Sequence, residues 1–181
     1  MHPTKAKRLV VDASVVHAMG GPDADAQEAD PPRSACCRDV LLAVRRVCHS
    51  VALTPSIAAE WSRHQSTHAC QWRCAMDGGK KIARPDAPQS DALRETIRDT
   101  AADDEMAEAM LKDAPLIEAA LAADGIVVSL DDRARGFFAA IARRIPELRR
   151  IMWVNPERLA MRQLEEWLEA GAEDNEGLRL G

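Results

Sequence analysis

The sequence has few of the side chains on which several common classes of protein depend. Its 181 residues include no tyrosine, two phenylalanines and four tryptophans, a poor supply for a protein that stacks RNA bases on an aromatic sheet surface. An excess of positive charge is also missing, because 24 Lys and Arg residues face 29 Asp and Glu residues and the formal net charge is −5. We therefore do not expect a protein that coats nucleic acid non-specifically.

Long hydrophobic runs are absent as well. No apolar run approaches the roughly 20 residues that span a bilayer, and the apolar stretch after residues 1–8 is too short for the core of a signal peptide. We expect a cytoplasmic protein with no membrane contact. The five cysteines are an odd number and include the adjacent Cys36 and Cys37, which favours reduced thiols, mostly in the core, over a disulfide framework.

Short apolar runs and helical patterns alternate along the chain. The runs lack a clean polar alternation, as expected for strands that are buried on both faces of a parallel sheet. Residues 37–48 and 134–141 have the apolar spacing of amphipathic helices. The pattern predicts an α/β fold, a three-layer α/β/α sandwich with a short parallel sheet and right-handed crossovers. The expected strands are residues 9–11, 51–53, 126–128 and 151–154.

Prolines and charged segments indicate where elements begin and how the chain is divided. Thr54-Pro55, Asp113-Ala114-Pro115 and Asn155-Pro156 have the form of helix starts. Between Glu60 and Lys112 there is helical spacing and no strand signal, so we expect an inserted helical arm at about residues 62–111. Residues 1–170 are expected to form a single domain, with an acidic mobile loop at 20–32 and a flexible tail at 171–181.

Acidic residues occur near the expected carboxyl edge of this sheet. Asp12 ends the first strand, Asp131 follows the third, Glu60 lies in the first two turns of a helix, and Asp113 stands at an expected helix start. Ligands of open parallel sheets bind outside the carboxyl ends of the strands. Two carboxylates ~4 Å apart repel by about 4 kcal/mol at an effective dielectric constant of 20, so such a cluster needs a cation or shared protons.

Oxygen-only ligands favour Mg²⁺ or Mn²⁺, and such ions stabilise charge on a phosphate during in-line displacement. Each acid taken alone is more simply explained as a turn former or helix cap. The coincidence of four acids favours the metal site.

The segments that contain these acids resemble the four acidic motifs of the PIN-domain family, in order and in context, across roughly residues 8–155. The segments are Leu9-Val10-Val11-Asp12-Ala13-Ser14, Thr54-Pro55-Ser56-Ile57-Ala58-Ala59-Glu60, Lys112-Asp113-Ala114-Pro115-Leu116-Ile117-Glu118-Ala119-Ala120-Leu121 and Val127-Val128-Ser129-Leu130-Asp131. The resemblance implies a PIN-like parallel-sheet fold and an Mg²⁺- or Mn²⁺-dependent endoribonuclease for single-stranded RNA. Such proteins are often the toxin of a toxin–antitoxin pair.

The resemblance also implies roles for individual residues. Asp12, Glu60, Asp113 and Asp131 would form the catalytic quartet. Asp12 and Asp131 would be metal ligands, Asp113 a ligand or a group that positions water, and Glu60 a ligand or the base for the attacking water. Three further residues would support the site. Ser14 and Ser129 match hydroxyl residues of the motifs. Of the adjacent Asp131 and Asp132, one could coordinate the metal while the other caps the following helix.

Arginines follow the last acidic motif. Arg133 and Arg135 lie closest to Asp131 within residues 133–150, which hold several arginines and the single acid Glu147. Arginine side chains match phosphate oxygens, so this strip could bind an RNA backbone. A solvated helix face with ordinary ion pairs is an equal alternative.

Two further patterns have simpler explanations. On one helix, His64 and His68 would face a different side from Cys70 and Cys74, so one zinc ion could not reach all four, and buried thiols beside half-exposed histidines are favoured. Apolar stripes on two helices are expected to be core, or a homodimer or antitoxin surface if they are exposed. The stripes contain Trp61, Trp72 and Met76, and Leu164, Trp167 and Leu168.

Three functions therefore follow, in order of preference. The first is the metal-dependent ribonuclease. The second is a non-catalytic PIN-like module that binds a protein or RNA, with the helical arm as its binding element. The third is a small-molecule phosphohydrolase that forms an aspartyl phosphate, ranked last because Ser14 stands where that chemistry usually has a second aspartate.

Overall fold

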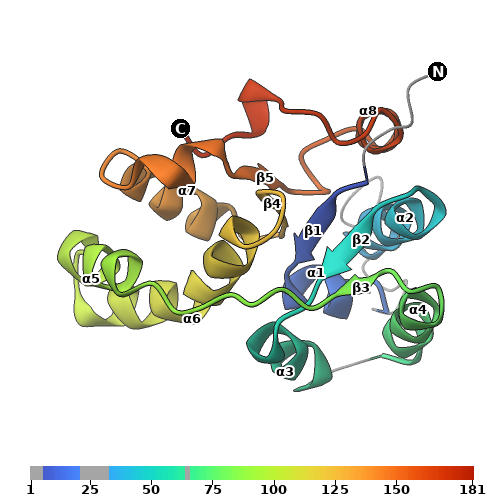
Figure 1. The fold of residues 1–181 in the computed structure, drawn as a ribbon, viewed down its shortest axis with the longest axis horizontal. Helices are drawn as coiled ribbons and strands as arrows, with labels where there is room; N and C mark the ends of the chain where they lie inside the picture. The colour runs from blue at the N-terminus through green and yellow to red at the C-terminus, as the bar shows by residue number, and fades with distance from the viewer. Residues whose placement is uncertain (1–5, 21–32, 64–65) are drawn as a thin grey trace.

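Five short strands form one all-parallel sheet in the computed structural model, which describes residues 6–20, 33–63 and 66–181. The strand order is β3-β2-β1-β4-β5, with β1 at the centre (Figure 1). Val11 lies opposite Val128, and Leu9 opposite both Val51 and Ile126. The predicted α/β class with a short parallel sheet is therefore confirmed. The strands are β1 (Arg8–Val11), β2 (Ser50–Ala52), β3 (Ile82–Ala83), β4 (Ile126–Val128) and β5 (Met152–Val154).

Helices pack in two groups around this sheet (Figure 1). One group contains α1 (Ala13–Ala18), α2 (Arg33–Arg46), α4 (Thr67–Gly78) and α8 (Met161–Glu169), and the other contains α5 (Asp91–Thr100), α6 (Asp104–Leu121) and α7 (Asp132–Ile141). Helix α3 (Pro55–Arg63) contacts α1 and α6, so it joins the two groups. This arrangement fits a three-layer sandwich. Within the described ranges, no helix combines the length and apolar character needed to cross a membrane.

The apolar stripes of the sequence belong mostly to the core, and Trp167 is half-buried against it. Trp61, Met76 and Leu164 are fully buried, and Trp72 is nearly so. The indole N–H of Trp61 donates to the carbonyl of Val11 at 2.9 Å, and that of Trp72 donates to a carbonyl of α2 at 2.8 Å. The N–H of a buried tryptophan usually finds such a partner, and here the two bonds join α3 to β1 and α4 to α2.

The segment expected as an inserted arm is built into the sandwich. It contains α4, β3, α5 and the first part of α6, and β3 pairs with β2 in parallel, with Val51 opposite Ile82. The expectation of a strandless arm was wrong because β3 has only two residues, both half-buried, and lies at the sheet edge. Two residues are too few to form the apolar run by which a strand can be predicted from the sequence.

Only one of the three expected proline helix starts is a helix start. Helix α3 does begin at Pro55. Asp113 instead lies inside α6, whose true N-cap is Asp103, and the helix continues through Pro115. The side chain of Asn155 is bound to Leu130, Asp132 and Glu157 in a turn, and α8 begins only at Met161.

The last residues of the chain are packed, contrary to the expected flexible tail. Ala172 is fully buried and Leu180 is 4% exposed. The backbone N–H of Leu180 donates to Ile151 at 2.9 Å, and Arg179 forms an antiparallel bridge with Met152 on β5. The expectation was wrong because the segment is polar on average, whereas two of its few apolar residues, Ala172 and Leu180, are buried. The greater part of the expected mobile loop, residues 21–32, lies outside the described residues.

The cysteines divide between core and surface. Cys36 and Cys37 on α2 are buried, as expected, and burial raises the pKa of Cys37 to about 12. Cys48, Cys70 and Cys74 are exposed. The expectation that most thiols lie in the core is therefore wrong. Cys70 and Cys74 occupy the outer face of α4, whose inner face is filled by larger apolar side chains.

His49 is a fully buried histidine that joins the start of β1 to the end of α8. Its Nδ1 accepts from the backbone N–H of Lys7 at 3.0 Å, and its Nε2 lies 2.8 Å from the carbonyl of Leu168. This pair of contacts requires the neutral ring with the proton on Nε2. Burial lowers the pKa of His49, opposed by its bond to Leu168.

Acidification should therefore destabilise the fold through His49. Because its pKa in the folded protein lies below the ordinary 6.5, the histidine contributes stability above that pH, which is lost as the pH falls. Gln can keep both contacts without titrating, so His49→Gln should reduce the loss of unfolding free energy between pH 7 and pH 5. Urea titrations of both proteins measure it, and parallel pH profiles would contradict the role of His49.

Candidate active site

Asp12 occupies the first position after β1, where two hydroxyl groups fix its carboxylate. The backbone N–H of Asp12 donates to Val128 at 2.9 Å, which continues the parallel ladder by one residue. Ser14 and Ser129 both donate to Oδ2 of Asp12, at 2.5 and 2.8 Å. Their oxygens in turn accept the backbone N–H groups of Leu130 and Asp131. The two serines therefore hold the carboxylate of Asp12 through its Oδ2.

Glu60 is brought beside Asp12 by α3. The neighbouring residue, Trp61, binds the last carbonyl of β1, so this part of α3 is held at the carboxyl edge of the sheet. The Glu60 side chain is 53% exposed and forms an ion pair with Arg63 at 3.2 Å. Glu60 is therefore an exposed, ion-paired carboxylate at the rim of the site rather than a buried one.

Asp113 completes a pocket with these two acids. The pocket has a volume of about 440 Å³, and Asp12, Glu60 and Asp113 all line it, together with the basic residues Arg63 and Lys112. We call it the acidic pocket. Asp12 follows β1 and Glu60 lies on α3, whereas Asp113 is presented from the interior of α6 and not from the helix start expected from the sequence.

Like charges surround Asp113. Burial, followed by the negative charges of Asp12, Asp131 and Glu60, raises its pKa from 3.8 to about 7 against the opposing charge of Lys112. Carboxylates that share a site in this way favour a proton or a cation between them. The charges of the other three predicted acids, Asp12, Asp131 and Glu60, therefore all act on Asp113.

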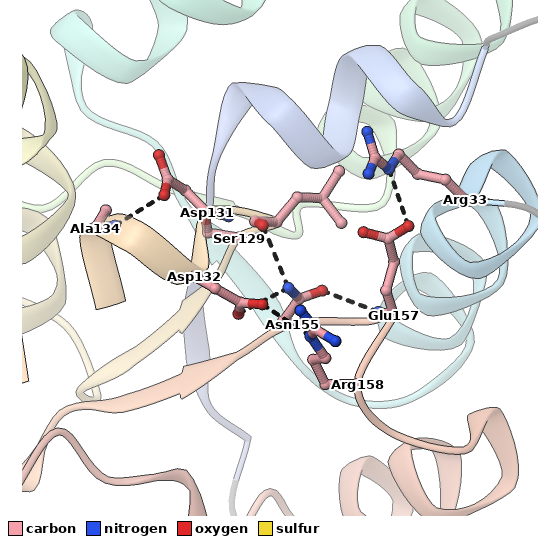
Figure 2. A network of polar contacts seen from close by, with 9 residues as sticks. Arg33, Ser129, Asp131, Asp132, Ala134, Asn155, Glu157 and Arg158 are labelled. Atoms are coloured by element: carbon pink, nitrogen blue, oxygen red, sulfur yellow. Dashed lines mark hydrogen bonds and ion pairs between the residues drawn. The ribbon is translucent and has the colours of Figure 1, made fainter. Parts of the chain in front are cut away.

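The two consecutive aspartates after β4 have different tasks. Asp131 caps α7 through a bond from the backbone N–H of Ala134 to its Oδ1 at 2.8 Å. Asp132 accepts from Asn155 at 2.9 Å and from Arg158 at 2.8 Å. Their carboxylates point in different directions (Figure 2). Because Asp131 acts on the pKa of Asp113, it is the member of the pair that belongs with the other acids.

The chemistry of this donor set fits a hard divalent cation, but the side chains do not form a ready coordination sphere. Carboxylate oxygens are the ligands that Mg²⁺ and Mn²⁺ prefer. Among the described residues, however, no group of three or more His, Cys, Asp or Glu side chains is close enough to hold one ion. Repulsion between ionised carboxylates favours such a separation when no cation is present. To bind one ion together, the acidic side chains would have to rotate toward it.

Other predicted groups lie elsewhere. Arg133 is exposed at the start of α7, and Arg135 donates to the carbonyl of Gly177 in the C-terminal segment at 3.3 Å. Neither lines the acidic pocket. The basic residues that do so, Arg63 and Lys112, were not predicted, because their positions depend on the helical faces of α3 and α6. Of the residues weighed for zinc, His64 lies outside the described chain.

Replacing Asp113 should make the fold more stable at alkaline pH. Its folded pKa of about 7 lies above the ordinary 3.8, so its ionisation costs stability as the pH rises toward 7, by about 3 kcal/mol between pH 5 and pH 7 at 1.36 kcal/mol per pH unit. Asp113→Asn removes that loss. Urea unfolding at pH 5 and pH 8 measures the difference, with Glu108→Gln on the exposed face of α6 as the control. An Asn variant that gains nothing at pH 8 would contradict the proximity of the acids.

No family model, curated protein sequence or solved structure matches this chain in the three comparisons made. The resemblance to PIN domains therefore stays a prediction from the motifs.

Proposed function

We propose that the protein is a metal-dependent phosphodiesterase of PIN-domain type that cleaves single-stranded RNA. The observation that supports it most is that four separate segments bring carboxylates to the region of the acidic pocket, at the carboxyl edge of a parallel sheet. Three of them line one pocket, and the fourth, Asp131, acts on the pKa of Asp113. Such an arrangement is unfavourable for the fold without a cation, which indicates a functional reason for keeping it.

Asp12, Asp113 and Asp131 are the residues that would hold Mg²⁺ or Mn²⁺. A bound divalent ion supplies positive charge that stabilises the phosphate in its transition state. Ser14 and Ser129 orient Asp12 through the two bonds to its Oδ2. Glu60, exposed at the rim beside Arg63, would bind the ion or accept a proton from the attacking water.

The choice of RNA and the biological role derive from the resemblance alone. Nothing in the pocket distinguishes a ribose from a deoxyribose by its 2′-hydroxyl. A toxin role and an antitoxin partner are implied by the family motifs, and a homodimer depends on an exposed apolar surface. Among described residues the large apolar side chains that are clearly exposed are Leu42 and Leu121, so the core accounts for most of the apolar stripes.

Cleavage of a labelled single-stranded RNA tests the proposal. We expect products in millimolar Mn²⁺ or Mg²⁺, none in EDTA, and recovery when the metal is restored. A DNA strand of the same sequence, run in parallel, tests the preference for RNA. Calorimetric titration with Mn²⁺ should show binding that is lost when Asp12 is replaced by Asn.

A non-catalytic module that binds protein or RNA is the second candidate. The observation in its favour is that no three acidic, histidine or cysteine side chains of the described chain are gathered closely enough for one ion. Absence of Mn²⁺ binding at millimolar metal, together with no cleavage, would favour this module over the nuclease.

A further inference from the structure

A hollow lined by arginines begins one residue beyond Asp131. It has a volume of about 510 Å³ and is formed by α7, the turn after β5 and the C-terminal segment. Two of its three arginines, Arg158 and Arg179, lie far from α7 in the sequence. We name it the arginine hollow, and its lining residues are Asp132, Arg135, Gly136, Ala139, Arg158 and Arg179.

We propose that the arginine hollow binds a backbone phosphate of the same polynucleotide whose scissile bond lies in the acidic pocket. The proposal rests on the proposed function, because it assumes that the substrate is a strand. It adds a binding site to that function and assigns it to Arg135 and Arg158.

The charges in the hollow favour an anion. Three guanidinium groups line the hollow with the carboxylate of Asp132, and one of them, Arg179, is already paired with Asp174 outside the lining. Arg135 donates to a neutral carbonyl at 3.3 Å, so this hydrogen bond does not cancel its charge. Arg158 uses its Nε for Asp132 at 2.8 Å and is 73% exposed, which leaves its two terminal nitrogens for a ligand. Guanidinium groups with free terminal nitrogens are well suited to phosphate oxygens.

Arg179 lines the hollow, but its ion pairs make it a weaker candidate than Arg135 and Arg158 for binding a phosphate. It forms a forked ion pair with Asp174 and lies 3.8 Å from Glu176, and both carboxylates are largely exposed. The pKa of Asp174 is lowered first by Arg179 and also by the more distant charges of Arg150 and Lys7.

The floor of the hollow is open. Nothing lies within 4 Å of the position that a Cβ atom on Gly136 would occupy, and Ala139, one turn later, adds only a methyl group. Two small residues on the same face of α7 leave room between the arginines for a group of the size of a phosphate.

The position of the hollow connects it to the acidic pocket. Asp131 and Asp132 are consecutive, so their Cα atoms are about 3.8 Å apart, and their carboxylates point in different directions (Figure 2). Asp131 interacts with Asp113 of the acidic pocket, whereas Asp132 lines the hollow. A strand bound in the hollow would thus pass the first turn of α7 on its way to the acids.

The groove beyond α3 is less suitable for a phosphate. It contains Arg73, Arg84 and Arg94 together with Asp86 and Glu118. Arg94 is bound through two nitrogens to Glu118, so its charge is already compensated.

Binding of a fluorescent single-stranded RNA in EDTA, followed by anisotropy, tests the hollow without any cleavage. The double variant Arg135→Gln/Arg158→Gln should bind about tenfold more weakly, and the slope of log K against log salt should become shallower by about 0.7 for each phosphate that the variant no longer neutralises. Asp132→Asn, which removes the carboxylate that pairs with Arg158 in the hollow, should bind more tightly. That opposite direction is not expected if the arginines merely maintain the fold. Arg162→Gln on α8, 89% exposed, is the matched control and should bind as the wild type does.

Failure of the hollow and failure of the nuclease give different results. RNA binding that depends on Arg135 and Arg158, without any cleavage, would support the hollow and refute the nuclease. Metal-dependent cleavage with an unchanged KM and an unchanged salt slope in the double variant would overturn the hollow alone. Binding of inorganic phosphate that depends on the two arginines, without RNA binding, would overturn the polynucleotide as the ligand.

Discussion

Replacing Asp12 with Asn is expected to reduce metal-dependent RNA cleavage by about 100- to 1,000-fold, the loss that follows removal of one preorganised charge-stabilising group. An Asn side chain has the same shape as the Asp side chain, and its one oxygen can still accept the hydrogen bonds from Ser14 and Ser129. The change therefore removes a negative charge with little disturbance of β1. Cleavage rates under single-turnover conditions, in Mn²⁺ and in Mg²⁺, measure the effect.

Two controls make this result specific. Glu108→Gln neutralises an exposed acid on α6 and should leave the rate unchanged, which separates the site from the overall charge of the molecule. Identical purification of the Asp12→Asn protein shows whether a contaminating nuclease produces the signal. Retained cleavage in Asp12→Asn would remove the basis for the acidic pocket as the catalytic centre.

The second large effect is expected at the ion pair that joins α5 to α6. Arg94 donates to both carboxylate oxygens of Glu118, at 3.0 and 3.1 Å, and the backbone N–H of Ser90 donates to one of them at 2.9 Å. The side chain of Glu118 is 4% exposed and that of Arg94 17%. Glu118→Gln leaves a buried guanidinium without its counter-charge, so the free energy of unfolding should fall by about 3–5 kcal/mol.

The cost should come from the unpaired charge and not from a smaller side-chain volume. In the double variant Arg94→Met/Glu118→Leu both charges are gone, and we expect most of the stability to return. The surface pair of Arg162 with Glu166 is 89% and 62% exposed, and Glu166→Gln should cost less than about 1 kcal/mol. Urea unfolding of the four proteins supplies the comparison. Equal losses for Glu118→Gln and the double variant would show that the ion pair is not the source of the stability.

Much of the sheet could be predicted because its strands are apolar, short and buried. β1, β2, β4 and β5 all coincide with runs of apolar residues, and burial on both faces produces such runs directly. β3 could not be predicted in the same way. Its two residues are only half-buried and acquire their strand conformation from pairing with β2, which is distant in the sequence.

The sequence was sufficient to predict that the acids lie near one edge of the sheet. It was not sufficient to predict the position of each acid within its helix or turn. Asp12 and Asp131 follow strands, so the topology alone brings them to one edge of the sheet. Asp113 was misplaced because a proline two residues later has the form of a helix start, whereas α6 begins at the stronger cap Asp103. The positions of Arg158 and Arg179 beside α7 could not be predicted from the sequence, because only the folded chain brings the turn after β5 and the C-terminal segment to that helix.

The packed C-terminal segment has a practical consequence for handling the protein. β5 is an outer strand of the sheet, and the bridge from Arg179 to Met152 together with the bond from Leu180 to Ile151 occupies part of its free side. Exposed strand edges recruit other chains and lead to aggregation. Truncation after residue 170 should therefore yield a self-associating protein, and an affinity tag is better attached at the amino terminus.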